Sequence, residues 1–181
     1  MIDKKILLSL YLKTNWVTSM LNSKHIYIVL LALLLLGSCA TNKDLREQQR
    51  QLRAKSVAEA VANRHFTLCI KQMYPMQGGS KVITSDFFLQ LQGDTINSYL
   101  PYLGRAYSIP YGGGKGLNFI DKVRDYRSVQ VKSDQVDISF SVVNDEDTYL
   151  YNLEIYDNGN ANIRVIPRER DRISYDAEMD Y

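Results

Sequence analysis

The stretch VDISFSVVNDEDTYLYNLEIYDNGNANIRVI, residues 136–166, decides the fold class of this chain. Apolar and polar residues alternate along residues 136–142 and again along 149–155, a period of two that is typical of β-strands with one buried face. Residues 144–147 form a turn between them, and Asn158-Gly159 is a dipeptide that favours a tight type I′ hairpin. Because connections this short force neighbouring strands to run antiparallel, the stretch predicts three consecutive strands of a meander.

The same alternation continues on both sides of this stretch. It covers residues 161–166 and 173–179 towards the C-terminus, and residues 66–70, 87–91, 95–100 and 126–132 towards the N-terminus. Turn-forming Gly, Pro and Asp residues separate the segments, which brings the expected count to about eight strands. The last five of them have the short connections of an antiparallel meander.

One helix is predicted ahead of the strands. Between Arg46 and Asn63 there is no Gly or Pro, and the good helix formers Ala, Gln, Glu and Arg dominate. A narrow apolar stripe at spacings of three and four consists of Ala54, Val57, Ala58 and Val61. The predicted fold class is therefore α+β: one N-terminal helix packed on a mainly antiparallel β-sheet or half-barrel of about eight strands. A barrel and an open sheet covered by the helix are the alternatives.

A targeting segment precedes this domain. Residues 26–36 are all apolar, a run too short to cross a bilayer, which takes about 20 residues, but suited to the core of a signal peptide. Leu36, Gly37 and Ser38 then precede Cys39, an order that resembles a bacterial lipobox. In such a motif the small residues admit a signal peptidase, and the cysteine thiol carries a diacylglycerol. We therefore expect Cys39 to be lipidated.

The chain is expected to have three parts. Residues 1–38 are the signal-peptide region, residues 39–46 the lipidated cysteine and a tether, and residues 47–181 a single helix-plus-β domain. Met20 would give a compact start to the signal peptide, so residues 1–19 are expected to be an extension ahead of the true start. Ala40 follows the cysteine where an inner-membrane retention signal would have Asp, which favours a lipid-anchored place at the outer membrane, facing the periplasm or the cell surface.

The charge distribution argues against a nucleic-acid partner. Four of the 22 basic residues and one of the 20 acidic residues precede Cys39, which leaves the rest of the chain close to neutral. A broad positive field, which would hold nucleic acid, is therefore not expected on the folded part.

The richest candidate for a binding surface is the Tyr–Gly segment, residues 99–119. It combines Pro and Gly, which impose an irregular backbone path, with tyrosines, whose rigid rings carry a polar tip and suit contact surfaces. The candidate binding residues are Tyr99, Tyr102, Arg105, Tyr107, Tyr111 and Lys115. The alternative is a structural loop that packs its rings on the edge of the sheet.

Catalytic and metal-binding patterns are sparse. His65 is the one histidine after Cys39, and nothing in the sequence aims a nucleophile at it. The glycine run 112–116 lacks the spacing of a phosphate-binding loop, and the acidic turn 144–147 lacks the geometry of a calcium site. Cys69 is expected to be a sheltered thiol that points away from the apolar face of its strand. We predict no catalytic residue, no metal and no cofactor.

Several blocks of the chain resemble one known family. They are Leu91-Gln-Gly-Asp-Thr-Ile96, Tyr99-Leu-Pro-Tyr-Leu-Gly-Arg-Ala106, Tyr111-Gly-Gly-Gly-Lys-Gly-Leu-Asn-Phe119, Asp145-Glu-Asp-Thr-Tyr149 and Asp157-Asn-Gly159. Together they are similar to the domain-of-unknown-function 4251 family of small bacterial lipoproteins, over roughly residues 47–180. The resemblance implies a helix followed by an antiparallel β domain. It implies no activity, cofactor or catalytic residue.

These observations predict a membrane-anchored envelope lipoprotein that acts as a non-catalytic binding module. Its partners would be the membrane, through Cys39, and an envelope protein, peptide or glycan. One alternative is a carrier or sensor of an apolar ligand inside a half-closed β-barrel. The other is a hydrolase that uses paired carboxylates.

Overall fold

The computed structural model describes residues 40–108 and 114–180, so the signal-peptide region, Cys39 and Tyr111 lie outside the described residues. The chain divides into two compact units, residues 1–49 and residues 50–181. In the first unit the described side chains, residues 43–49, are helical and exposed. The second unit carries the β domain, to which the rest of this account refers.

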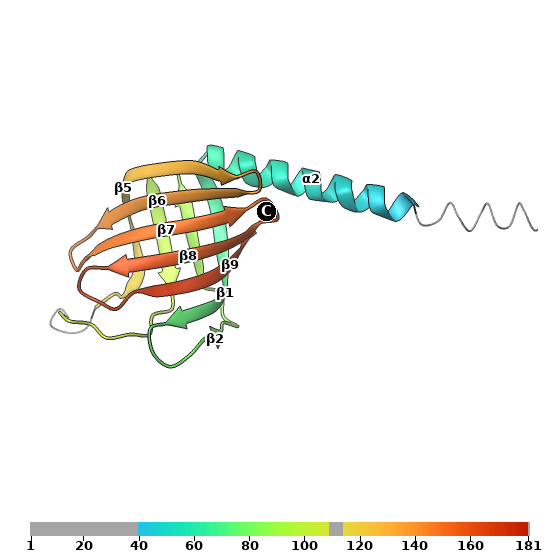
Figure 1. The fold of residues 1–181 in the computed structure, drawn as a ribbon. Coiled ribbons are helices and arrows are strands. Elements are labelled where there is room, and N and C mark those ends of the chain that lie inside the picture. Colours follow the sequence, from blue (N-terminus) through green and yellow to red (C-terminus); the bar gives the residue numbers. More distant parts are fainter. Residues whose placement is uncertain (1–39, 109–113, 181) are drawn as a thin grey trace, which may run out of the picture. The chain divides into compact units, whose positions relative to one another are not determined.

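One helix and nine strands follow one another along the described chain (Figure 1). They are α2 (Ala40–Ala62), β1 (His65–Pro75), β2 (Lys81–Val82), β3 (Phe88–Gln92), β4 (Thr95–Leu100), β5 (Leu117–Lys132), β6 (Gln135–Val143), β7 (Thr148–Tyr156), β8 (Asn160–Pro167) and β9 (Ile173–Asp180). The predicted helix, strands and C-terminal meander are therefore confirmed in outline.

Eight of the strands form a closed antiparallel barrel. Neighbouring strands pair in the order β1, β3, β4, β5, β6, β7, β8, β9, and β9 pairs back with β1. β1 can close the ring because its residues 65–69 pair with β3 along one edge while residues 67–75 pair with β9 along the other. The expected half-barrel or open sheet is corrected to this closed form. Closure pairs β1 and β9, which would otherwise form open edges of a curled sheet.

The helix contributes two fully buried residues to the core. Val57 and Val61 are buried, Ala54 is half-buried and Ala58 is exposed, so the predicted stripe is right except for Ala58. A step of one residue turns a helix by about 100°, which carries Ala58 out of the contact that Val57 makes. No helix among the described residues has the length and hydropathy needed to cross a membrane.

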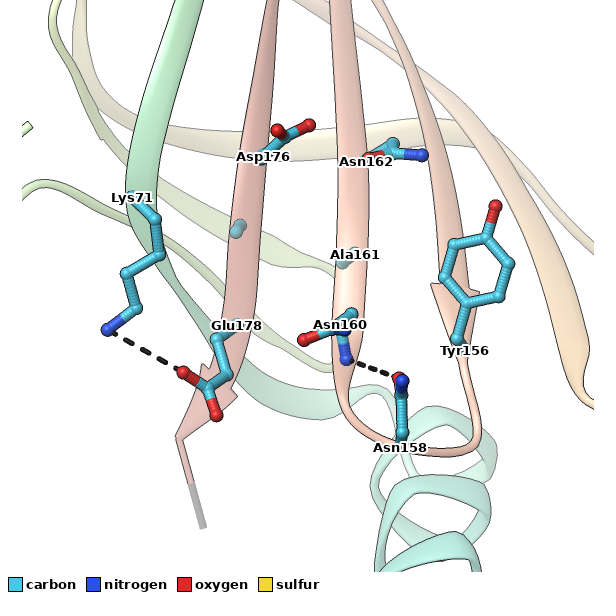
Figure 2. A pocket seen from close by; sticks show the side chains of 9 residues that line it. Lys71, Tyr156, Asn158, Asn160, Ala161, Asn162, Asp176 and Glu178 are labelled. Carbon is cyan, nitrogen blue, oxygen red and sulfur yellow. Dashed lines mark hydrogen bonds and ion pairs between the residues drawn. The ribbon is translucent and has the colours of Figure 1, made fainter. Parts of the chain in front are cut away.

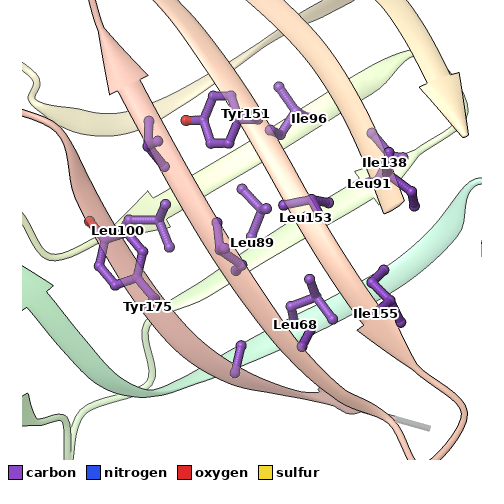
Figure 3. Close-up of a cluster of buried hydrophobic side chains, with 14 of the residues drawn as sticks. Leu68, Leu89, Leu91, Ile96, Leu100, Ile138, Tyr151, Leu153, Ile155 and Tyr175 are labelled. Carbon is purple, nitrogen blue, oxygen red and sulfur yellow. The ribbon is translucent and has the colours of Figure 1, made fainter. Parts of the chain in front are cut away.

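Buried hydrophobic side chains from several strands cluster inside the barrel (Figure 3). Tyr149, Tyr151, Leu68 and Ile163 have no solvent-accessible surface, and Tyr175 has 1 %. The four residues without accessible surface are therefore packed on all sides and border no space that holds a water molecule. Burial raises the pKa of Tyr149 to about 12, and it also raises the pKa of Tyr151. Both hydroxyls therefore stay protonated inside the barrel.

Candidate functional site

One row of outward-facing residues runs across five neighbouring strands. Its members face one another directly in the strand register: Asn160, Glu178, Cys69, Phe88 and Tyr99, on β8, β9, β1, β3 and β4. Residues directly opposite in antiparallel strands project from the same face of the sheet. Four intervals of about 4.8 Å make the row roughly 19 Å long. It has polar side chains at one end and aromatic rings at the other.

Two grooves on the outer face follow this row, and Lys71 lines both. The first, which we call the amide groove, has a volume of about 530 Å³ (Figure 2). It is lined by Lys71, Tyr156, Asn158, Asn160, Asn162, Asp176 and Glu178. The second, the aromatic groove, has a volume of about 440 Å³ and is lined by Thr67, Cys69, Lys71, Asp86, Phe87 and Phe88, among others. Both volumes fall in the range of ligand sites, about 300–1,000 Å³.

A β-bulge places Lys71 between the two grooves. Ile70 is paired with Ala177 and Gln72 with Asp176, which are consecutive on β9, so Lys71 is an extra residue on β1. Bulges redirect a side chain and are frequent next to functional sites. In Figure 2 Lys71 extends from β1 towards Glu178, and the ammonium nitrogen Nζ lies 3.8 Å from Glu178 Oε2. The bulge therefore puts one positive charge in an otherwise acidic and amide-rich region.

An aromatic cluster forms the far end of the row. The rings of Phe87 and Tyr99 stack with centroids 4.9 Å apart, and the Phe88 ring lies 5.8 Å from that of Tyr99. Tyr99 is 44 % exposed. The cluster thus offers ring surface to a ligand in the aromatic groove while its own geometry is held by packing.

Cys69 lies at the middle of the row and is half-buried. This agrees with the expectation of a sheltered thiol that points away from the apolar face of its strand. Burial raises its pKa, and the charge of Asp180 raises it further. A thiol with a raised pKa is mostly protonated at neutral pH and is a poor nucleophile.

Asp171 fixes three members of the predicted binding surface. The Tyr107 hydroxyl donates to Oδ1 at 2.6 Å, the Arg105 amide donates to Oδ2 at 3.0 Å, and the Tyr102 hydroxyl donates to the Asp171 carbonyl at 3.0 Å. The bond from Tyr107 and that from the Arg105 amide lower the pKa of the Asp171 carboxyl. Tyr102 is half-buried against the core, whereas Tyr107 is 69 % exposed. This part of the Tyr–Gly segment is therefore held rigidly against the β8–β9 connection.

A buried ionic cluster holds the other end of the segment. The Arg170 guanidinium donates from Nη2 to Glu146 Oε2 at 2.9 Å, and both side chains are only 7 % exposed. The Lys115 amide donates to Glu146 Oε1 at 2.7 Å, and Lys115 Nζ pairs with Asp145 at 3.0 Å. The bond to Asp145 raises the pKa of Lys115 and lowers that of Asp145.

Asp147 ties the cluster to the strand connections. Its buried carboxylate accepts hydrogen bonds from the amides of Thr148, Arg168 and Glu169 and lies 3.9 Å from Arg170 Nε. The sequence predicted only a turn at residues 144–147, but the side chains of Glu146 and Asp147 are buried structural groups. The same cluster explains why residue 114 is a glycine. A Cβ at this position would lie 2.7 Å from Arg170 Nη2 and 2.8 Å from Glu146 Oε2, too close for either side chain to keep its place.

The structure separates the predicted binding residues into three places. Tyr102, Arg105 and Tyr107 gather at Asp171, Lys115 lies at the ionic cluster, and Tyr99 belongs to the outer row. Sequence reasoning missed the groove residues on β1, β8 and β9. Their signal was present in the outward positions 160, 162, 176 and 178, which carry only Asn, Asp and Glu. Polar residues at such positions are typical of any solvent-facing side of a strand. Only the strand register shows that they lie beside Lys71 and the aromatic cluster.

The comparisons with known proteins concern the whole β domain. The model of a family described as a domain of unknown function, DUF4251, matches residues 48–179. The chain belongs to the DUF4251 family. A crystal structure of a DUF4251 family protein from Bacteroides eggerthii has a TM-score of 0.54 at 16 % identity and covers 71 % of this chain and 87 % of that one. At this identity the likeness shows the fold alone. No curated protein matches the chain.

Proposed function

We propose that this DUF4251 protein is a lipid-anchored, non-catalytic binding module of the cell envelope whose ligand is a neutral glycan. The glycan would lie along the outer row, in the amide groove and the aromatic groove. The observation that carries the proposal is the bulge residue Lys71, which joins the two grooves into one polar path with aromatic rings at its end.

The chemistry of the path suits a ligand rich in hydroxyl groups. Asn160 and Asn162 each offer an amide donor and acceptor, and carboxylates accept from hydroxyls. The ring faces of Phe88 and Tyr99 can pack against the C–H face of a sugar. Asp86, Asp176, Glu178 and Asp180 line the grooves against one lysine, so an acidic glycan would be repelled. These features favour a neutral glycan over an acidic one.

The two alternatives have less support. A carrier of an apolar ligand needs space inside the barrel, and the buried core side chains fill it. A hydrolase with paired carboxylates needs acids that are free to exchange protons. Glu146 and Asp147, neighbouring acids with buried side chains, instead bind Arg170 and backbone amides.

Removing the two groove amides is expected to weaken glycan binding. The double variant Asn160→Ala/Asn162→Ala should lower affinity by about 5- to 140-fold, because two net hydrogen bonds contribute about 1–3 kcal/mol and 1.4 kcal/mol is a factor of ten. Binding would be measured on an array of neutral and acidic oligosaccharides and then by calorimetry with the tightest neutral binder. The matched control is Asn97→Ala/Asn152→Ala, whose amides lie outside both grooves. Equal losses in both variants, or binding of acidic glycans only, would contradict the proposal.

The membrane anchor has its own test, for which the chain supplies an internal control. With the full chain expressed in a Gram-negative host, Cys39→Ser is expected to move the protein from the membrane fraction to the soluble fraction. Cys69→Ser should leave it in the membrane fraction, because that thiol belongs to the folded domain. Mass spectrometry of the N-terminal peptide should find an acylated cysteine. An unmodified Cys39, or a serine variant that stays with the membrane, would contradict anchoring.

A further inference from the structure

Each part of β5 is paired with a strand on one side only. The strand is 16 residues long, but β4 pairs only with residues 117–122. β6 pairs with residues 123–132 except at two bulges, which leave out Asp125, Tyr126 and Val131. The last backbone bond on the β4 side runs from the Val123 amide to the Asp94 carbonyl. Beyond it, residues 127–132 have no strand partner along that edge in the described part of the chain. We call this the free edge.

The free edge is also uncovered. All six residues from Arg127 to Lys132 are exposed, including Val129 at 58 % and Val131 at 52 %. A covering helix or loop would bury at least one face of such a strand. The backbone N–H and C=O groups along this edge therefore have no strand partner in the described part of the chain, as in edge strands that accept another chain. The Lys132 carbonyl accepts a hydrogen bond from Gln130 Nε2 at 2.6 Å.

The ligand that matches a row of alternating backbone donors and acceptors is an extended polypeptide. The side chains along the edge indicate which kind of polypeptide would bind. Residues 124–132 contain Arg124, Arg127 and Lys132 against the single acid Asp125, a net charge of +2. Opposite charges across paired strands stabilise a sheet and like charges destabilise it. Val129 and Val131 add exposed β-branched surface, which favours apolar residues on the added strand.

We infer that the free edge of β5 binds an extended, acidic segment of another protein by adding it to the barrel as a strand. In the antiparallel register that places Val129 opposite Gln130, two copies of this edge would bring Arg127 opposite Lys132, and these like charges would destabilise the pairing. The inferred site is independent of the proposed glycan path, which follows β8, β9, β1, β3 and β4 instead.

The test uses the full lipoprotein in detergent micelles and the capped peptide Glu-Val-Thr-Val-Glu-Val-Thr-Glu. Hydrogen–deuterium exchange should slow at residues 127–132 when this peptide is added. A version with N-methylated backbone amides keeps the charges but cannot pair, and it should give no protection. The variant Arg127→Glu/Lys132→Glu should weaken binding at least about tenfold, whereas the control Lys122→Glu, on the half of β5 that β4 covers, should not.

Three results would overturn the inference. Equal protection by the N-methylated peptide would mean that charge alone draws the peptide to the surface. Protection confined to a segment other than residues 127–132 would place the binding elsewhere. Protection of the free edge that rises with protein concentration in the absence of peptide would make a second copy of this chain the occupant.

Discussion

The variant Arg170→Met is expected to unfold with a free energy about 3–5 kcal/mol lower than that of the wild type. The reason is the burial of its partners: Glu146 has 7 % of its side chain exposed and Asp147 has none. Removal of one partner of a buried ion pair leaves an uncompensated charge, which costs more than the pair contributed. Methionine keeps most of the side-chain volume, so the loss reports on charge rather than on a cavity. Chemical denaturation with urea would measure it.

Arg168→Met is the matched control for this prediction. Arg168 is two residues away and forms a pair with Glu169 at 3.7 Å, but 78 % of its side chain is exposed. Exposed pairs contribute about 0–1 kcal/mol, so this variant should be close to the wild type. If Arg170→Met proved as stable as Arg168→Met, the Arg170 ionic cluster would not stabilise the fold, and its described role in holding the Tyr–Gly segment would be wrong.

The variant Tyr151→Ala is expected to lose a similar amount, about 3–5 kcal/mol, for a different reason. Its ring is fully buried and stacks on Phe140 with centroids 5.0 Å apart, and its hydroxyl lies 3.1 Å from Ser98 Oγ. Truncation leaves a cavity that the surrounding strands cannot fill. Tyr151→Phe should cost only about 1 kcal/mol, because Ser98 still donates to the Leu117 carbonyl at 2.8 Å.

This second prediction also bears on function. Tyr99→Ala, on the outer face, should be far less destabilising, because 44 % of its surface is already exposed. A Tyr151→Ala variant as stable as the wild type would mean that its ring borders space inside the barrel. The carrier alternative would then become the better explanation. Thermal unfolding of the three tyrosine variants side by side would decide between a packed and a hollow barrel.

The strands themselves could be predicted because the residues that specify each strand lie within or next to it in the sequence. Alternation along β6 and β7 and the Asn158-Gly159 turn specify one buried face and antiparallel neighbours, whatever the rest of the chain does. The closure of the barrel could not be predicted in the same way. It depends on β1 pairing with β9, and no turn or spacing joins segments that lie so far apart in the sequence.

The candidate site was harder to predict for the same reason. The Tyr–Gly segment drew attention because its unusual residues are consecutive, yet Tyr102 and Lys115 prove to be held by hydrogen bonds to other parts of the chain. The groove residues come from strands that are distant in sequence. Only the register shows that Cys69, Phe88 and Glu178 are neighbours.

The pairing of β1 with β9 has a consequence for how the protein reaches its final state. Leu68 and Met179 are partners although about 110 residues separate them, and contacts of such sequence distance slow folding. A chain that emerges N-terminus first makes β1 available early and β9 last. Until β9 is available, one edge of β1 is unpaired and can pair with a non-native strand. The strand that closes the barrel, β9 (Ile173–Asp180), is therefore also the last to become available for pairing.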